Sequence, residues 1–410
     1  MTIHIVGAGV AGLSAAVKLC DTGTDVVVHE AAPQAGGRCR SWLDPMLDAT
    51  IDNGTHVIVG ANHAVTSFAA AIGSTDDLHW FVGGASFRDL DDGTTWTVAR
   101  ATDALRLAHC WGGSPWREGV GALRLGCASA ATTIEACLPS RSVLAHRFWR
   151  PLARAVMNTD PKIASAGPFA RVLRRTLARG ASAMRVGIAR RSLSACFIDP
   201  ALALLRQSGI AVRFGTRLRA IDHAGERITK LHFGAAEIVV LPNDRVILAL
   251  APWDLARCLP DLAPELAASA IVNLHAVLPT ALAPREPRLL GLIGGTAEWL
   301  VVRGNVVSAT VSAADQLTAC DPSTIAALLW RDIARALDLP TDVPSRLRIV
   351  KEHRATPLQT PAFERRRPGV TTRFGNLTLA GDWVEPGLPC TLEAAIASGV
   401  RAAEFGHARI

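Results

Sequence analysis

An α/β fold with a parallel sheet and a second, interleaved α+β domain is predicted by three features of the sequence. A strand, a glycine-rich turn and a helix open the chain, short strands follow one another near its middle, and a strand ending in Gly-Asp precedes a helix near its end. Strands that alternate with helices are typical of parallel sheets. At 410 residues the chain also exceeds the size at which one core usually stops growing, which favours two domains.

The first 30 residues have the strand–turn–helix–strand order of a dinucleotide-binding unit. Residues 3–6 are an apolar strand, the glycine-rich turn covers residues 7–12, and the helix is expected to end at Gly23. The second strand, residues 25–30, closes on Glu30, about 20 residues beyond the glycines as such units require.

Each of these residues has a physical task. Gly7 permits the tight turn, Gly9 lets the backbone approach a pyrophosphate, and Gly12 allows close packing of helix on strand. The helix N-terminus offers free N–H groups to the phosphates, and Glu30 is placed to accept hydrogen bonds from a ribose diol. The sequence therefore predicts a Rossmann-like dinucleotide site.

The segment Gly36-Gly37-Arg38, just beyond the second strand, favours FAD over NAD as the cofactor. Two glycines allow a sharp turn against the cofactor, and a guanidinium suits a pyrophosphate or the flavin edge. The alternative is a surface turn with an incidental arginine. This extension resembles the FAD-binding signature of amine oxidases, phytoene desaturases and protoporphyrinogen oxidases, which implies an FAD cofactor.

A run of short strands is predicted in the middle of the chain, at residues 210–214, 217–221, 228–233, 237–241 and 245–250. By pattern alone this is a β-rich segment. It resembles the central part of the FAD domain in the same family, where a backbone group near the position of Leu218 contacts adenine.

The C-terminal segment resembles the second FAD signature of that family. A strand at 377–380 ends in Gly381-Asp382, and a helix starts near Thr391, its expected N-cap. Asp382 can hold a ribityl hydroxyl, and the positive end of the helix suits negative charge on a reduced flavin. The residues predicted to bind FAD are Gly7, Gly9, Val10, Ala11, Gly12, Glu30, Ala31, Gly36, Gly37, Arg38, Leu218, Gly381, Asp382, Thr391 and Leu392.

The sequence disfavours amine oxidation. Amine oxidases of this family place a lysine near the flavin and a pair of aromatics, often tyrosines, around the amine. This chain has no tyrosine, and residues 271–278, where the lysine is expected, contain none. Trp383 could replace one aromatic, and we predict that Trp383 and Pro389 contact the substrate.

Motifs spread over nearly the whole chain resemble one group in particular, the hydroxysqualene dehydroxylases of bacterial hopanoid synthesis. The motifs are Asp52-Asn53-Gly54-Thr55-His56, Asn158-Thr159-Asp160-Pro161, Ala164-Ser165-Ala166, Asp199-Pro200-Ala201, Ile271-Val272-Asn273-Leu274-His275, Glu352-His353-Arg354-Ala355-Thr356, Ala380-Gly381-Asp382-Trp383 and Gly387-Leu388-Pro389. His353 and Cys390 depart from the pattern.

The resemblance implies reductive removal of an allylic hydroxyl from hydroxysqualene, a C30 isoprenoid, by hydride from reduced FAD. An acid must protonate the leaving oxygen. His56 is the first candidate and Asp52 the second, four residues earlier on the same face; both could instead hold the backbone around the cofactor. No second nucleotide fingerprint appears, which predicts an external reductant. The alternatives are a desaturase of squalene or carotenoid precursors and a non-catalytic prenyl-lipid carrier.

The net charge of +7 is concentrated in residues 141–191, which hold eleven arginines and one lysine against one acid. A helix is expected near 169–179, with Phe169, Val172, Leu173, Thr176 and Leu177 on one face and Arg171, Arg174, Arg175 and Arg179 largely on the other. Such a helix suits an anionic membrane surface, or it is a solvated surface helix. No nucleic-acid-binding module appears.

We expect a cytoplasmic protein, at most peripheral on the inner face of the membrane. The N-terminus lacks the positively charged region of an export signal, and no run in the chain is long and apolar enough to cross a bilayer. The nine cysteines lack metal-like spacing, so no metal site is predicted. The expected FAD-binding domain comprises residues 1–75, 195–260 and 370–410, and the substrate domain residues 76–194 and 261–369.

Overall fold

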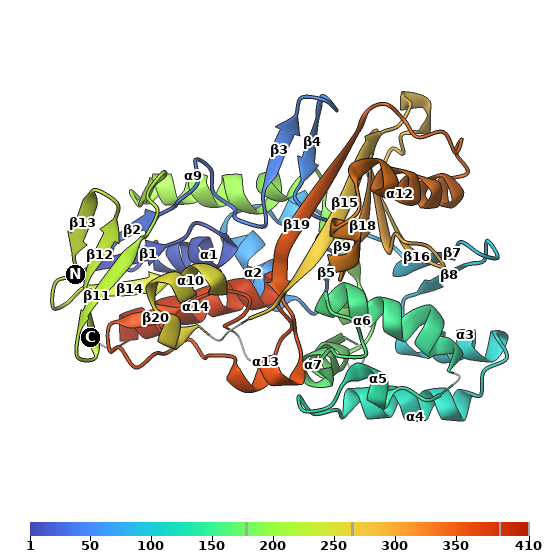
Figure 1. Cartoon of the computed structure of the whole chain (residues 1–410), viewed down its shortest axis with the longest axis horizontal. Helices are drawn as coiled ribbons and strands as arrows, with labels where there is room; N and C mark the ends of the chain where they lie inside the picture. The colour runs from blue at the N-terminus through green and yellow to red at the C-terminus, as the bar shows by residue number, and fades with distance from the viewer. Residues whose placement is uncertain (141, 177–178, 264–265, 385–386, 409–410) are drawn as a thin grey trace.

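The computed structural model describes residues 1–140, 142–176, 179–263, 266–384 and 387–408, arranged in two lobes (Figure 1). Both termini lie in the first lobe. Its centre is a five-stranded sheet in the order β10-β2-β1-β14-β20, in which all neighbours run parallel. The strands are β1 (Thr2–Val6), β2 (Asp25–His29), β10 (Ala211–Arg213), β14 (Arg245–Leu248) and β20 (Leu377–Leu379).

Helices α1 (Val10–Leu19) and α14 (Leu392–Ala408) pack together beside this sheet. A side chain at Gly399 of α14 would place its Cβ 2.0 Å from the carbonyl oxygen of Ala11, so the helices cross in backbone contact. α1 ends at Leu19 and not at Gly23, because the amide of Cys20 already bonds back to Val17; Gly23 (φ +67°) forms the turn into β2.

The remaining elements of the first lobe frame this layer. An antiparallel sheet comprises β11 (Ala220–Ala224), β12 (Arg227–Phe233) and β13 (Ala236–Val239). The helices are α2 (His63–Ala71), α9 (Asp199–Gln207), α10 (Pro252–Cys258) and α13 (Pro361–Arg366), and a π-helical turn at Ser194–Ile198 leads into α9. The hairpin β3 (Ser41–Asp44) and β4 (Ala49–Asp52) extends toward the second lobe.

The second lobe is built on a seven-stranded sheet in the order β19-β15-β18-β17-β16-β7-β8. Its strands are β7 (Ala85–Asp89), β8 (Thr95–Val98), β15 (Ala268–Val277), β16 (Arg288–Ile293), β17 (Trp299–Arg303), β18 (Val306–Val311) and β19 (Leu347–Pro357). A small sheet joins β5 (Ile58–Val59), β9 (Val186–Ala189) and β6 (Leu78–Trp80). The helices are α3 (Ala101–Cys110), α4 (Pro115–Gly126), α5 (Ile134–Cys137), α6 (Arg150–Met157), α7 (Ala166–Thr176), α8 (Ala181–Met184), α11 (Asp315–Thr318) and α12 (Pro322–Leu337).

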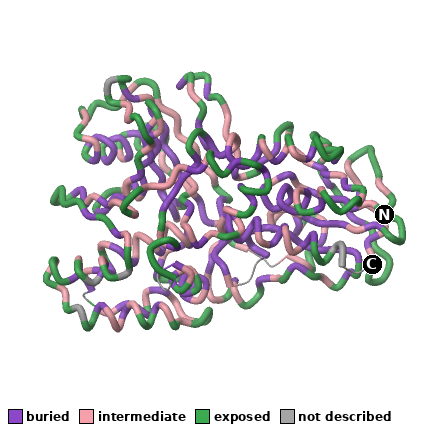
Figure 2. The backbone as a smooth tube through the Cα atoms, turned by 180° about the vertical axis from the view of Figure 1, so that it is seen from behind, coloured by how far each residue is buried: buried purple, intermediate pink, exposed green. Residues whose placement is uncertain are grey.

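The buried side chains form three apolar cores. One lies around the parallel sheet and draws on residues 3–78, 189–259 and 363–403. The others lie in the second lobe, one drawing mainly on residues 87–188 and one mainly on 272–336. Buried segments run through the interior of both lobes (Figure 2). Where the domain boundaries fall stays a prediction.

The basic segment forms helix α7, and its apolar face is turned inward. Phe169 and Leu173 are buried in the core of the second lobe, so this face is not available to a bilayer. Leu177, assigned to the same face, lies outside the described residues. The guanidinium of Arg174 donates to the carbonyl of Gly126, and that of Arg175 lies 3.7 Å from Glu393. Along the described chain, no helix is long and apolar enough to cross a membrane.

Because His29 and His275 are buried, we predict that acid destabilises the fold. Burial lowers the pKa of His29 and of His275 to about 4, against an ordinary value of 6.5. Between these values the unfolded chain binds protons that the folded chain does not. The free energy of unfolding should therefore fall as pH decreases, by roughly 1.4 kcal/mol per pH unit for each histidine.

Urea unfolding between these pH values measures this slope. His29→Gln should reduce the slope, whereas His353→Gln, which changes an exposed histidine, should leave it unchanged. A protein that becomes more stable as pH falls across this range would contradict the prediction.

Candidate flavin site

Close backbone packing shapes the turn after β1. Gly7 has φ +107°, and a Cβ there would lie 2.4 Å from the carbonyl oxygen of Ala249. A Cβ on Gly12 would lie 1.9 Å from the carbonyl oxygen of Gly7. A Cβ on Gly9, in contrast, would meet no protein atom within 4 Å. The turn therefore leaves open space only at Gly9, directly before the N-terminus of α1, where a pyrophosphate would be held by Val10 and Ala11 N–H groups.

Glu30 ends β2 with its carboxylate beside this turn. One oxygen accepts a hydrogen bond from the amide of Ala8 at 2.7 Å, and the other accepts from the amide of Ala32 at 2.8 Å. Each carboxylate oxygen keeps a further lone pair for a ribose hydroxyl. Glu30 thus fixes the glycine turn. Its binding of a ribose, and the contact of the next residue Ala31 with FAD, stay predictions.

A second glycine turn lies against the first. The amide of Gly36 donates to the carbonyl of Ala8 at 2.8 Å, and the Cβ position of Gly37 lies 3.5 Å from Gly9 Cα. Gly36 and Gly37 have φ +108° and +56°, a region that glycine tolerates best. Residues 7–12 and 36–37 therefore form one cradle.

Arg38 and Asp382 form a two-pronged ion pair at this cradle. Arg38 Nη1 and Nη2 donate to the Asp382 oxygens at 2.9 and 2.6 Å, and Nη1 also donates to the carbonyl of Ala355 at 2.6 Å. Desolvation opposes the charge of Arg38, but the attraction of Asp382 outweighs it and raises the pKa of the guanidinium. The fold thus brings together two predicted FAD residues from opposite ends of the chain.

The N-terminus of α14 follows this pair. α14 begins at Leu392, and the carbonyl of Thr391 accepts its first helical bond from Ala395 at 3.0 Å. The Thr391 hydroxyl donates to the carbonyl of Pro389 at 3.2 Å, and Thr391 stands directly before the first residue of the helix, where its predicted N-cap lies. The amide of Gly381 donates to Ser398 of the same helix at 2.8 Å, which ties the strand end to α14.

Leu218 lies in the connection between β10 and β11. This connection is anchored beside Glu30, because the amide of Thr216 donates to the Glu30 carbonyl at 2.8 Å. Leu218 follows Thr216 by two residues, and Thr216 contacts Glu30, the predicted ribose-binding residue. The predicted contact of the Leu218 backbone with adenine is compatible with this position.

Trp383 and Pro389 do not present an open surface to a substrate. Trp383 is fully buried in the core of the first lobe, and its indole N–H donates to the carbonyl of Leu250 at 3.0 Å. Pro389 is buried in the turn that leads to α14. The prediction of substrate contact is not supported for Trp383, because the hydrogen bond to Leu250 turns its ring inward.

Asp52 is not a free acid. Its carboxylate pairs with Arg303 on β17 and accepts hydrogen bonds from the Ser41 hydroxyl at 2.6 Å and the Leu193 amide at 3.0 Å. β4 ends at Asp52, so His56 lies in a loop and does not share a strand face with it. Asp52, the second predicted acid, is thus a buried carboxylate whose ion pair with Arg303 joins the two lobes.

His56 lies near the Arg38–Asp382 pair. Desolvation by the surrounding protein lowers its pKa below 6.5, Asp52 and Asp382 raise it, and Arg38 lowers it. The residue is nevertheless part-exposed. His56 is thus a part-exposed side chain near the Arg38–Asp382 pair, and its role as an acid stays a prediction.

Three buried residues to which the sequence analysis gave no role hold the site in place, although Asn273 belongs to one of its motifs. Asn273 on β15 donates to the carbonyl of Asn53 at 3.1 Å, next to the loop that contains His56. Arg367 donates to the carbonyls of Asp382, Trp383 and Leu388. The side-chain oxygen of Gln359 accepts from the amide of Cys390 at 2.8 Å. Their partners are backbone groups distant in sequence, so no local pattern could indicate them.

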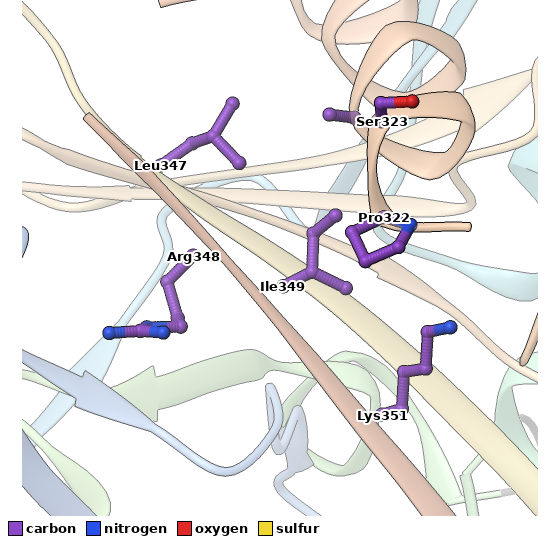
Figure 3. A pocket seen from close by; sticks show the side chains of 7 residues that line it. Pro322, Ser323, Leu347, Arg348, Ile349 and Lys351 are labelled. Carbon is purple, nitrogen blue, oxygen red and sulfur yellow. The ribbon is translucent and has the colours of Figure 1, made fainter. Parts of the chain in front are cut away.

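A separate cavity of about 630 Å³ lies between α12 and β19 (Figure 3). It is lined by Pro322, Ser323, Ala326, Leu347, Arg348, Ile349 and Lys351, none of which is a predicted FAD residue. Lys351, one of four lysines in the chain, donates to the carbonyls of Thr318 and Cys320 at 3.0 and 2.7 Å. This lysine is thus committed to a structural role.

The chain matches the model of the flavin-containing amine oxidoreductases over residues 10–404. It therefore belongs to this family, and it is an FAD-dependent oxidoreductase. Solved structures with the same fold include an oxidoreductase from Methanosarcina mazei, with a TM-score of 0.74 at 14% identity over 98% of this chain and 100% of that chain. Cyclohexylamine oxidase from Brevibacterium oxydans has a TM-score of 0.70 at 15% identity over 100% and 99%.

Within the family, the chain belongs with the hydroxysqualene dehydroxylases. It is 39% identical to the protein of that name from Rhodopseudomonas palustris, over 98% of both chains. It is 35% identical to the one from Zymomonas mobilis, again over 98% of both. The predicted family and the predicted FAD cofactor are thus confirmed.

Gly9→Ala should separate cofactor binding from folding. The new methyl group meets no protein atom, and Gly9 has φ −70°, which alanine adopts easily. It would instead project into the space for the pyrophosphate. We expect unchanged thermal stability of the flavin-free protein and a flavin affinity about tenfold lower or worse, since 1.4 kcal/mol of lost contact suffices.

Gly12→Ala is the matched comparison, because its methyl group would collide with the Gly7 carbonyl and should lower stability itself. Flavin titration followed by absorbance, with thermal unfolding of the same samples, measures both effects. If Gly9→Ala binds FAD like the unmodified protein, the cradle is misassigned.

Proposed function

We propose that this enzyme removes the hydroxyl group from hydroxysqualene and yields squalene. The observation that carries the proposal is the relationship to three hydroxysqualene dehydroxylases at 35–39% identity over about 98% of the chain. The absence of tyrosine and of a lysine on β15 supports it, because the amine-oxidising relatives rely on such residues.

The reaction replaces a C–O bond with a C–H bond. Bound reduced FAD would supply the hydride to carbon, and the oxygen would leave as water after it accepts a proton. This stoichiometry needs a proton donor at the leaving oxygen and a two-electron donor that reduces the flavin again. We propose His56 as the proton donor, a separate reductase or free reduced cofactor as the electron source, and a structural role for Asp52.

Geometry gives each residue a distinct task. The glycine cradle and Glu30 hold the nucleotide end of FAD, and Arg38 with Asp382 fixes the segment before α14. Asn273 and the Asp52–Arg303 pair hold the N-terminal end of the loop that contains His56. His56 lies in this loop, part-exposed and under the electrostatic influence of Arg38 and Asp382.

The second candidate function is desaturation of squalene or a carotenoid precursor. A probable zeta-carotene desaturase from Synechococcus elongatus is 27% identical to this chain, over 54% of this chain and 52% of its own. That relationship is weaker and covers only about half of each chain. It therefore supports a shared fold and cofactor more than a shared substrate. A non-catalytic prenyl-lipid carrier is disfavoured by the intact cradle.

Product analysis tests the proposal. Enzyme with photoreduced FAD, incubated without oxygen with hydroxysqualene, should form squalene in an amount equal to the reduced flavin. Oxidised enzyme with squalene should form no desaturated product. If the reduced enzyme leaves hydroxysqualene intact while the oxidised enzyme desaturates a polyene, desaturation is the function. A colourless protein that cannot take up FAD would indicate a carrier.

His56→Gln should slow the single turnover by roughly 10²- to 10⁴-fold, the usual contribution of a general acid. Desolvation lowers the pKa of His56, so only a minor fraction is charged at neutral pH. The rate of the unmodified enzyme should therefore rise about tenfold per pH unit as pH falls toward that pKa, and His56→Gln should lose this dependence.

Asp52→Asn is the matched control. It leaves Arg303 without its charged partner and should lower the free energy of unfolding by about 3–5 kcal/mol. Its rate should still rise as pH falls, but over a lower pH range, because the charge of Asp52 raises the pKa of His56. A rate that loses its pH dependence in Asp52→Asn but keeps it in His56→Gln would exchange the two roles.

A further inference from the structure

Helix α4 has an exposed apolar face. Trp116 and Leu123 are 81% and 67% exposed, and they lie seven residues apart, on one side of the helix. Val120 is part-exposed between them, and the exposed Cys127 continues the same row directly after the helix. Large side chains are seldom exposed together in this way unless they meet a partner or a membrane.

The opposite face of α4 is fully engaged by the protein. Leu125 is buried in the core of the second lobe, and Gly121 lies so close to Pro139 that a Cβ would approach its Cδ to 2.6 Å. Arg174 of α7 donates to the carbonyl of Gly126 at the end of α4. α4 thus lies on the outside of the lobe (Figure 1), held by α3, α5 and α7.

The exposed charges along this row are positive, and Glu135 on the neighbouring α5 is paired with Arg150. Arg117 and Arg124 are exposed on α4, and Arg106 is exposed on α3. The two acids of residues 101–133 are both engaged: Glu118 is buried and accepts from the Ser142 hydroxyl at 2.5 Å, and Asp103 accepts from the Arg100 amide at 2.8 Å. The surface presented by α4 is therefore apolar at its centre and cationic at its sides.

We propose that this face of α4, and not α7, docks the protein on an anionic lipid surface. Tryptophan and leucine enter the acyl boundary, and arginine side chains pair with the phosphates of anionic headgroups. The combination of apolar row and cationic border suits such a surface better than a neutral one, because each part is matched by one layer of the bilayer. The inference does not depend on which lipid the enzyme converts.

Vesicle binding by the FAD-loaded full-length protein tests the proposal. The protein should cosediment with phosphatidylglycerol vesicles, bind phosphatidylcholine vesicles at least about tenfold more weakly, and dissociate at high salt, where charge attraction is screened. The double variant Trp116→Ser, Leu123→Ser should lose at least about tenfold in binding. Arg117→Gln with Arg124→Gln should reduce binding to the anionic vesicles only.

Leu241→Ser is the matched control, since Leu241 is 58% exposed on the other lobe. It should bind vesicles like the unmodified protein. Flavin absorbance and thermal unfolding of every variant show whether the fold is kept. Quenching of fluorescence by lipids brominated on their acyl chains adds a direct measurement, and Trp116→Phe should remove it although nine of the ten tryptophans remain.

Binding that is unchanged in the double variant, or no binding to anionic vesicles, would overturn the proposal. So would a dimer that dissociates on Trp116→Ser, because a second copy would then cover the face. Turnover of substrate dispersed in detergent should be the same in the double variant and the unmodified protein. A failure of the membrane proposal alone would leave that turnover intact, whereas a failure of the proposed function would abolish it in both.

Discussion

The site depends on the ion pair between Arg38 and Asp382, which joins residues 344 positions apart. The pair forms only because backbones pack closely beneath it. Gly12 allows α1 to touch the turn after β1, and Gly399 allows α14 to touch α1. Since α14 follows Asp382, this contact sets where the carboxylate can lie. A larger side chain at Gly12 would push α1 away from the turn after β1, and one at Gly399 would push α14 away from α1.

Local sterics made the nucleotide-binding half of the site predictable from sequence. The tasks of Gly7, Gly12 and Glu30 follow from the conformations and hydrogen bonds of a short turn, so spacing within the first 30 residues was sufficient. Strand positions were also predicted closely, for example β12 and β14. The predicted end of α1 at Gly23 was wrong, because the helix ends at Leu19, where the amide of Cys20 bonds back to Val17. The position of the next glycine does not determine where this happens.

Partners distant in sequence were not predictable. Asp52 looked like a second acid, but its function is set by Arg303, 251 residues away on the other lobe. Trp383 looked like a substrate contact, but the carbonyl of Leu250 fixes its ring in the core. The residue type indicates which chemistry a side chain can perform, whereas its contacts in the fold decide whether its polar group is free to perform it. His56 lies near Arg38 and Asp382, and only the resemblance of its motif to a family pointed to it.

The two basic helices show why amphipathic character alone does not locate a surface. α7 has an apolar row and arginines, yet Phe169 and Leu173 face the core, so its arginines serve neighbouring elements. α4 has two apolar rows, of which one faces the core and the other, with Trp116 and Leu123, faces solvent. A buried apolar face needs no partner because the protein already covers it. An exposed apolar face bordered by exposed arginines can make further contacts of both kinds, and an anionic bilayer offers both together.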